Sequence, residues 1–174
     1  MKSSKMWWDS VKSDSDKFND WLIKQYRGEV TAASRIKSFA DNYATDSRNK
    51  KILGVIAKQE SKHAAWVLDL LMARGIEPNI EHAEERYWKE TLPEVESFET
   101  GAAVGAHAEA MRLERIKVIC EDHSAPADVR EVFKKILREE IFHERAFRTM
   151  AGVEAMIATQ ESHERGKELL GLEA

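Results

Sequence analysis

The sequence predicts an all-α protein built as a four-helix bundle, and three observations support this fold class. Of its 174 residues, 33% are charged and 43% are hydrophobic, and only three prolines and eight glycines interrupt the chain. Apolar residues recur three and four positions apart over long stretches, which is typical of helices that bury one face. Glu-x-x-His occurs twice, at Glu60 and His63 and again, 80 residues later, at Glu140 and His143. Paired motifs of this kind on facing helices are typical of bundles that hold two metal ions.

The two halves of the chain repeat one pattern. Glu29 lies 31 residues before Glu60, and Glu109 lies 31 residues before Glu140. About one Glu-x-x-His is expected by chance in a chain this rich in glutamate, so the prediction rests on the shared register. This register indicates a duplicated helical hairpin. With the chain shifted by 80 positions and no gaps, the agreeing residues are Glu29, Arg35, Ile36, Lys37, Ile56, Glu60 and His63 in the first half, and Glu109, Arg115, Ile116, Lys117, Ile136, Glu140 and His143 in the second.

The first hairpin is predicted from two long amphipathic stretches. Its first helix covers about residues 15–44, with Ser13 or Ser15 as the capping residue. Glu29 falls on the apolar stripe of this helix, which is Leu22, Ala33, Ile36, Ala40 and Tyr43. Its second helix covers about residues 47–75 and ends at a glycine. The apolar stripe of this second helix is Leu53, Ile56, Glu60, His63, Val67 and Leu70.

The second hairpin repeats this arrangement. Its first helix covers about residues 97–122, and its second begins at Ser124 with Pro126 in the first turn, where proline is tolerated. A fifth, weaker helix covers about residues 153–170. The two stripes are Ala102, Ala106, Glu109, Leu113, Ile116 and Cys120, followed by Phe133, Ile136, Glu140, His143, Phe147 and Met150.

A long connection separates the two hairpins. Residues 76–97 join helices two and three and include a predicted short helix over 82–90. One long crossover of this kind distinguishes ferritin-like bundles from simple up-and-down bundles. The sequence therefore predicts a single domain with a C-terminal fifth helix. Its parts are an N-terminal arm over 1–12 that contains Trp7 and Trp8, the bundle over 13–152, and the C-terminal helix and tail over 153–174.

Composition excludes several classes of protein. The net charge of −4 is too mild to suggest nucleic-acid binding. The first residues lack the apolar core of a secretory signal, and no stretch approaches the 18 apolar residues of a membrane span. A single cysteine, Cys120, excludes an internal disulfide and an iron site with four cysteine ligands. We therefore expect a cytoplasmic protein.

Six polar residues fall in the middle of the four apolar stripes. Buried carboxylates are costly unless something compensates their charge. Two divalent cations would neutralise four glutamates, and imidazoles add neutral donors, so this set predicts a site for two metal ions. Mixed carboxylate and imidazole ligands favour iron, with manganese as the other possibility. The predicted ligands are Glu29, Glu60, His63, Glu109, Glu140 and His143.

The internal symmetry also predicts a role for each ligand. Glu60 and Glu140 are expected to bridge the two ions, while Glu29 and Glu109 are expected to be terminal ligands, each with one histidine. No catalytic residue beyond the metal ligands and no further cofactor-binding residue is predicted. The remaining histidines lack the register and are expected to be surface or ordinary polar residues; they are His82, His107, His123 and His163.

On these residues, the chain resembles the rubrerythrin branch of the ferritin-like superfamily from about residue 13 to residue 152. The resemblance implies a non-haem di-iron oxidoreductase that reacts with hydrogen peroxide or oxygen, and a homodimer. Rubrerythrins have a further glutamate one turn after the ligand of helix three, and this position is Arg112 here. The usual rubredoxin domain is missing, so the resemblance implies a separate protein as the electron donor.

Other functions fit the same ligands. Bacterioferritins have the same six-ligand pattern, which makes a ferroxidase that stores iron the main alternative. Their haem-binding methionine follows the first bridging glutamate, and Ser61 stands there, so haem is not expected. A structural bundle with a vestigial site, a manganese catalase and a di-iron oxygenase are the remaining alternatives.

Overall fold

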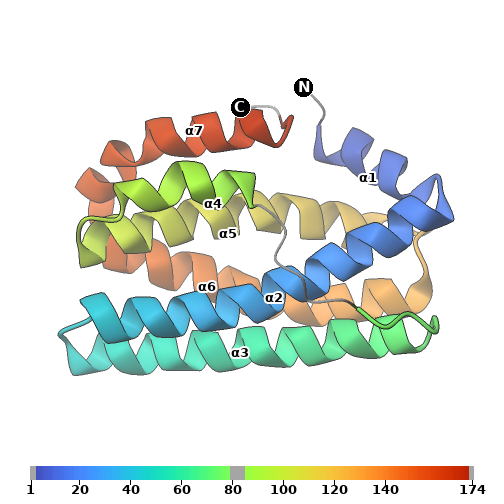
Figure 1. Cartoon of the computed structure of the whole chain (residues 1–174), viewed down its shortest axis with the longest axis horizontal. Helices are drawn as coiled ribbons and strands as arrows, with labels where there is room; N and C mark the ends of the chain where they lie inside the picture. The colour runs from blue at the N-terminus through green and yellow to red at the C-terminus, as the bar shows by residue number, and fades with distance from the viewer. Residues whose placement is uncertain (1–2, 79–84, 173–174) are drawn as a thin grey trace. The chain divides into compact units, whose positions relative to one another are not determined.

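The computed structural model describes residues 3–78 and 85–172, and these residues are helical almost throughout (Figure 1). The all-α fold class predicted from the sequence is therefore confirmed. Within the described residues, no helix combines the length and the apolar character that crossing a membrane requires. The elements are α1 (Ser4–Lys12), α2 (Ser15–Tyr43), α3 (Ser47–Met72), α4 (Arg86–Thr91), the 3-10 turn η1 (Leu92–Glu94), α5 (Phe98–Glu121), α6 (Ala127–Ala158) and α7 (Gln160–Leu169).

Helices α2 and α3 form the first predicted hairpin and pack against each other along their lengths (Figure 1). The cap of α2 is Asp14, so the prediction of Ser13 or Ser15 was wrong. The Asp14 carboxylate accepts hydrogen bonds from the backbone N–H groups of Asp16 and Lys17, at 2.8 and 3.2 Å. The Ser13 hydroxyl is used instead at the end of α1, where it donates to the Ser10 carbonyl. A carboxylate satisfies two of the free N–H groups at once.

The second hairpin, α5 and α6, begins with two different caps. Ser97 and Thr100 cap α5 reciprocally, because each side-chain oxygen accepts from the other residue's backbone N–H, at 3.1 and 3.0 Å. Helix α6 begins at Ala127, three residues later than predicted. The side chain of Asp122 accepts from the Ser124 N–H at 2.9 Å and its carbonyl accepts from the Ala125 N–H at 3.0 Å. These bonds form a turn that delays the helix.

A glycine separates α6 from the predicted fifth helix. Gly152 has φ of 72° and interrupts α6, and a residue without Cβ adopts this conformation at little cost. The fifth helix predicted over 153–170 is itself divided, because Thr159 separates the end of α6 from α7. In the crossover, α4 begins at Arg86 and Glu85 precedes the helix, so the helix starts later than predicted; His82 lies outside the described residues.

The chain groups into two compact units, and boundaries between them fall inside α1, α5 and α6. We call residues 8–78 and 119–136 the hairpin unit, and residues 3–7, 85–118 and 137–172 the crossover unit.

All the predicted stripe residues of α3 and α5 are buried, as are those of α6 except Met150. In α2 the stripe is buried at Leu22, Ile36 and Ala40, whereas Ala33 and Tyr43 are half-buried.

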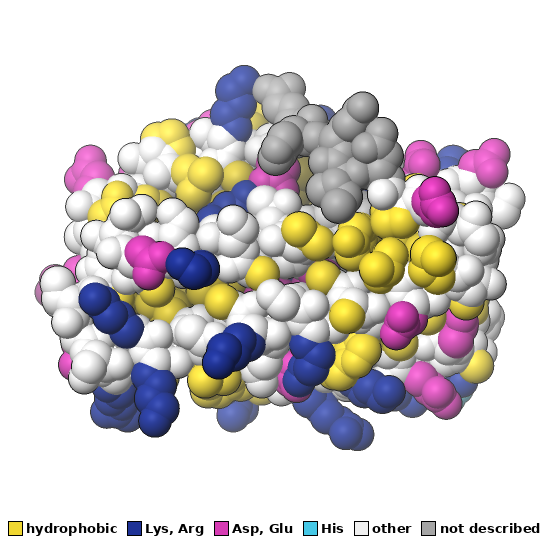
Figure 2. Space-filling view, turned by 60° about the horizontal axis from the view of Figure 1, so that its bottom comes forward, with side chains coloured by type: hydrophobic (Ala, Val, Ile, Leu, Met, Phe, Trp, Pro, Cys, Tyr) yellow, Lys and Arg dark blue, Asp and Glu magenta, His cyan; other side chains and the backbone are white. Residues whose placement is uncertain are grey.

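Charged side chains of both signs lie on the surface. Figure 2 shows lysine and arginine side chains together with aspartate and glutamate side chains on one face, with hydrophobic side chains between them. This mixture agrees with the small net charge. The most exposed large hydrophobic residues among those described are Val153 and Ile157, at 75% and 71%, one turn apart near the end of α6.

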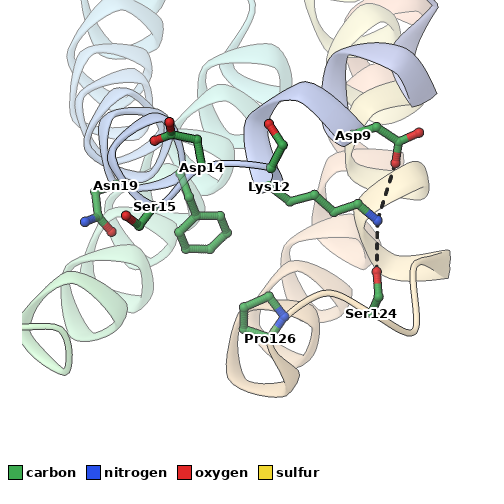
Figure 3. A pocket seen from close by; sticks show the side chains of 9 residues that line it. Asp9, Lys12, Asp14, Ser15, Asn19, Ser124 and Pro126 are labelled. Atoms are coloured by element: carbon green, nitrogen blue, oxygen red, sulfur yellow. Dashed lines mark hydrogen bonds and ion pairs between the residues drawn. The ribbon is translucent and has the colours of Figure 1, made fainter.

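In the hairpin unit, Trp8 anchors α1. Its ring is 1% exposed and packs edge-on against Trp21 at 5.0 Å. Its indole N–H donates to Asp122 at 2.8 Å, and the Lys12 ammonium lies 2.7 Å from the same carboxylate oxygen. Lys12 also reaches Asp9 and Ser124, beside a pocket of about 580 Å³ (Figure 3). Residues 4–12 of the N-terminal arm, whose role the sequence left open, therefore form a helix held in place by Trp8 and Lys12.

In the crossover unit, a buried group of aromatic residues joins α4, α5 and α7. The Tyr87 hydroxyl is hydrogen-bonded to His163 at 2.8 Å, and the His163 ring stacks on His107 with centroids 4.5 Å apart. The His107 N–H donates to the Met156 carbonyl at 3.2 Å. His107 and His163 are 5% and 8% exposed, so of the two expected possibilities, surface or ordinary polar residue, both are buried polar residues.

Glycine allows α5 and α6 to approach closely in the crossover unit. A Cβ atom at Gly105 would lie 2.9 Å from the ring of Phe147. Real Cβ atoms essentially never approach another heavy atom so closely. The small residue in α5 therefore makes room for the aromatic ring that α6 presents one turn after His143.

The anchor at Asp122 generates a stability prediction. Burial opposes its ionisation, but hydrogen bonds from Lys12, Ser124 and Trp8 outweigh this effect and hold the pKa of Asp122 well below its usual range. Asp122→Ala leaves a buried indole N–H without its acceptor, so we expect the free energy of unfolding to fall by about 1–3 kcal/mol. Urea unfolding followed by tryptophan fluorescence measures the change.

The matched control is Asp41→Ala, because Asp41 pairs with Lys37 on an exposed surface. This substitution is expected to change the free energy of unfolding by less than about 0.5 kcal/mol. Equal losses for the two variants would show that the Trp8 anchor contributes nothing special.

The buried histidine generates a prediction of pH dependence. Burial, with His107 beside it, lowers the pKa of His163 from 6.5 to about 4. The unfolded chain therefore takes up a proton on this residue before the folded chain does, and stability falls as the pH drops from 6.5 towards 4. For metal-free His163→Gln, we expect a smaller loss of stability between about pH 7 and about pH 5 than for the unmodified protein. His123→Gln, at an exposed position, should retain the full loss.

Candidate metal centre

Helices α2 and α3 bring three of the predicted ligands together in the hairpin unit. Glu29 comes from α2, and Glu60 and His63 come from α3; all three side chains are 0% exposed. The His63 Nδ1 atom lies 3.6 Å from a carboxylate oxygen of Glu29 and 3.6 Å from one of Glu60. One potential ligand atom from each residue lies within 4.8 Å of the others. We call this group the first half-site.

The crossover unit contains the corresponding group. Glu109 comes from α5, and Glu140 and His143 come from α6. The Nδ1 atom of His143 is 3.2 Å from a carboxylate oxygen of Glu140, and both residues are 0% exposed, with Glu109 at 8%. Their potential ligand atoms again lie within 4.8 Å of one another. We call this group the second half-site.

Helix geometry explains why each half-site forms. Residues three apart share one face of a helix, so Glu60 and His63 point the same way, as do Glu140 and His143. The remaining glutamate comes from the preceding helix, which packs antiparallel in the first hairpin (Figure 1). The identical spacing of 31 residues in both halves therefore gives both half-sites the same composition.

Aromatic rings cover the histidines. Trp66 stacks on His63 with ring centroids 5.6 Å apart, and Phe142 meets the ring of His143 edge-on at 6.1 Å. The ammonium groups of Lys62 and Lys135 lie 5.0 and 5.7 Å from the Trp66 ring. Trp66 was not among the residues predicted for the site, although its position three residues after His63 places it on the same helix face.

Arg112 contacts a ligand of the second half-site. Its Nε atom lies 3.2 Å from Glu140 Oε1, and its side chain is 21% exposed. The sequence left the role of this residue open, because the position carries a glutamate in rubrerythrins. The structure places the Arg112 guanidinium beside the Glu140 carboxylate.

The donor atoms fit a metal ion. Two atoms bound to one ion at about 2.1 Å are about 3.0 Å apart at a right angle and about 3.4 Å apart at a tetrahedral angle. The nitrogen–oxygen distances of 3.2 and 3.6 Å lie within and just above this range. Two carboxylates and one imidazole also neutralise one divalent ion, so burial of each half-site is compatible with a bound cation.

The fold and these two groups define a ferritin-like helical protein with buried carboxylate and histidine clusters suited to metal ions. A family model described as Rubrerythrin matches residues 20–151, which is more than half of the chain. The chain therefore belongs to the rubrerythrin family. No curated protein and no solved structure gives a significant match to the chain.

The burial of several carboxylates in one site generates the next prediction. Glu60→Gln keeps the size of the side chain and removes one negative charge from the first half-site. We expect the metal-free protein to become more stable, because fewer like charges are buried, and metal affinity to fall by at least about a hundredfold. Thermal unfolding of the metal-free protein and cobalt(II) titration measure the two changes.

Glu114→Gln is the matched control, since Glu114 is exposed on α5 and the substitution removes the same charge. It should leave both quantities unchanged. A loss of stability in metal-free Glu60→Gln would contradict the view that the buried carboxylates oppose folding.

Proposed function

We propose that the two half-sites together form one dinuclear centre for iron, in which Glu60 and Glu140 bridge the ions and Glu29 and Glu109 are terminal ligands. The observation that carries this proposal is the presence of two buried groups of identical composition in a chain of the rubrerythrin family. Four carboxylates would then balance two divalent ions. Imidazole and carboxylate donors favour iron, with manganese as the other candidate.

On this basis the protein is a rubrerythrin-like non-haem di-iron oxidoreductase that consumes hydrogen peroxide or oxygen. Bound iron would supply the two electrons that reduce the oxidant. A separate electron-donor protein would return these electrons. We further propose a homodimer that works in the cytoplasm.

The residues of the chain have defined tasks in this proposal. The four glutamates hold the ions with hard oxygen donors, and the histidines present their Nδ1 atoms to the carboxylates. The complete burial of five of the six side chains excludes bulk water from them. Low polarity around the ligands strengthens every charge interaction at the centre. Both half-sites stand on long helices, which hold the ligands in place with little rearrangement.

A ferroxidase that stores iron is the second candidate, and Arg112 is the observation that favours it. The extra glutamate of rubrerythrins is replaced here, so the ligand set reduces to the symmetric six of bacterioferritins. Without that carboxylate, each ion would keep its histidine in both oxidation states. Turnover with peroxide would then be slow.

Reaction of the iron-loaded protein separates the two candidates. We expect about two iron ions per chain after anaerobic loading with ferrous iron. The reduced protein should be oxidised faster by hydrogen peroxide than by oxygen, as measured by stopped-flow absorbance at matched oxidant concentrations. A sizing column should show a dimer.

Glu140→Ala, loaded in the same way, is the control for iron outside the centre. Faster oxidation by oxygen, with ferric mineral accumulating beyond two ions per chain in a large particle, would establish the ferroxidase instead. An iron content near zero would contradict both functions.

A further inference from the structure

The two half-sites share their ligands and spacing but differ at one neighbouring position. Three residues after the glutamate of the first helix in each hairpin, the first half-site has Ala32 and the second has Arg112. The Arg112 Nε atom is 3.2 Å from Glu140 Oε1, and the other oxygen of the same carboxylate is 3.2 Å from His143 Nδ1. One oxygen of Glu140 therefore faces the positive charge of Arg112, and the other faces His143.

The positive charge of the Arg112 guanidinium disfavours the binding of a metal ion in the second half-site. Arginine remains protonated at every pH at which the protein is folded, so its charge cannot be titrated away. Charge interactions are strong in a buried site, because little water screens them. A metal ion that enters the second half-site must displace Arg112 from Glu140 or bind beside its positive charge. The methyl side chain of Ala32 carries no charge, so the matching position imposes no such requirement on the first half-site.

We infer that Arg112 is a positioning residue that determines the order in which the two half-sites bind metal ions. The first half-site, which contains Glu29, Glu60 and His63, binds its ion first. The second half-site, which contains Glu109, Glu140 and His143, binds its ion afterwards. This inference rests on the proposed dinuclear centre. The Arg112 side chain is partly exposed, whereas Glu140 is not, so the guanidinium can move towards solvent when the second ion binds. Until then it compensates the charge of Glu140.

Cobalt(II) titration of the metal-free protein tests the order, with visible absorbance and calorimetry as readouts. We expect two steps whose dissociation constants differ by about tenfold or more, which corresponds to one ion pair of moderate strength. His63→Ala should remove the tight step, and His143→Ala should remove the weak step. Equal affinities, or loss of the tight step in His143→Ala, would overturn the inference.

Substitution of Arg112 tests its part in this order. Arg112→Gln should tighten the weak step by about tenfold, so that the two steps merge. Arg112→Lys keeps the charge and should retain two steps. Arg148→Gln is the matched control, because Arg148 pairs with Glu144 on the surface of α6, and its titration should equal that of the unmodified protein. An unchanged or weakened second step in Arg112→Gln would overturn the inference.

Thermal unfolding distinguishes this role from a purely structural one. Arg112→Gln should lower the unfolding temperature of the metal-free protein, because Glu140 loses its cation, while its affinity for the second ion rises. A residue that only supports the fold would lower both quantities together. Failure of the proposed function gives a different result. In that case neither the unmodified protein nor any of the variants would bind cobalt.

Discussion

Burial of four glutamate side chains in an apolar interior is the constraint on which the rest of this structure depends. Glu29, Glu60 and Glu140 are fully buried, and Glu109 nearly so. A buried charge that is not compensated costs several kcal/mol, which is a large part of the stability of a typical domain. The metal-free chain must offset this cost elsewhere. Long apolar stripes, the helix caps and the aromatic contacts around Trp8 contribute that stability.

The two half-sites have the same ligands but differ in what surrounds those ligands. In the second half-site, Arg112 brings a cation into contact with Glu140. In the first, the ammonium groups of Lys62 and Lys135 lie 5.0 and 5.7 Å from the ring of Trp66, which stacks on His63. A direct ion pair affects a ligand more strongly than charges that contact a neighbouring ring. Two groups of identical ligands therefore have different electrostatic surroundings.

Most of the fold followed from periodicity, because a helix that buries one face must repeat apolar residues every three or four positions. The burial of the α3 stripe, with Glu60 and His63 in it, was predictable for this reason. The cap of α2 was not predictable, because three adjacent polar residues, Ser13, Asp14 and Ser15, could each cap the helix. The outcome depends on the end of α1, where the Ser13 hydroxyl donates to the Ser10 carbonyl. The start of α6 depends on Asp122, whose partners Trp8 and Lys12 are more than 100 residues away in the sequence.

Long side chains set a similar limit on predicting the site. Spacing places Arg112 one turn after Glu109 but does not say how far its guanidinium reaches. Its partner Glu140 lies on a different helix, α6, so the spacing within α5 does not predict this contact. His107 was not expected to be a ligand, and its N–H donates to the backbone carbonyl of Met156. Its stacking on His163 was not predictable, because the repeat that relates the two hairpins does not include α7, the helix that carries His163.

The close approach of Gly105 to Phe147 has a consequence for how this chain can evolve. Even a methyl group at position 105 would displace the aromatic ring, and that ring follows His143 by one turn of α6. The two positions are therefore coupled: a larger residue at 105 is tolerable only where 147 has become smaller. In related chains that keep the same ligands, the sizes of these two side chains should vary inversely. The second half-site requires a fixed distance between α5 and α6, and this distance limits the combined size of the two side chains.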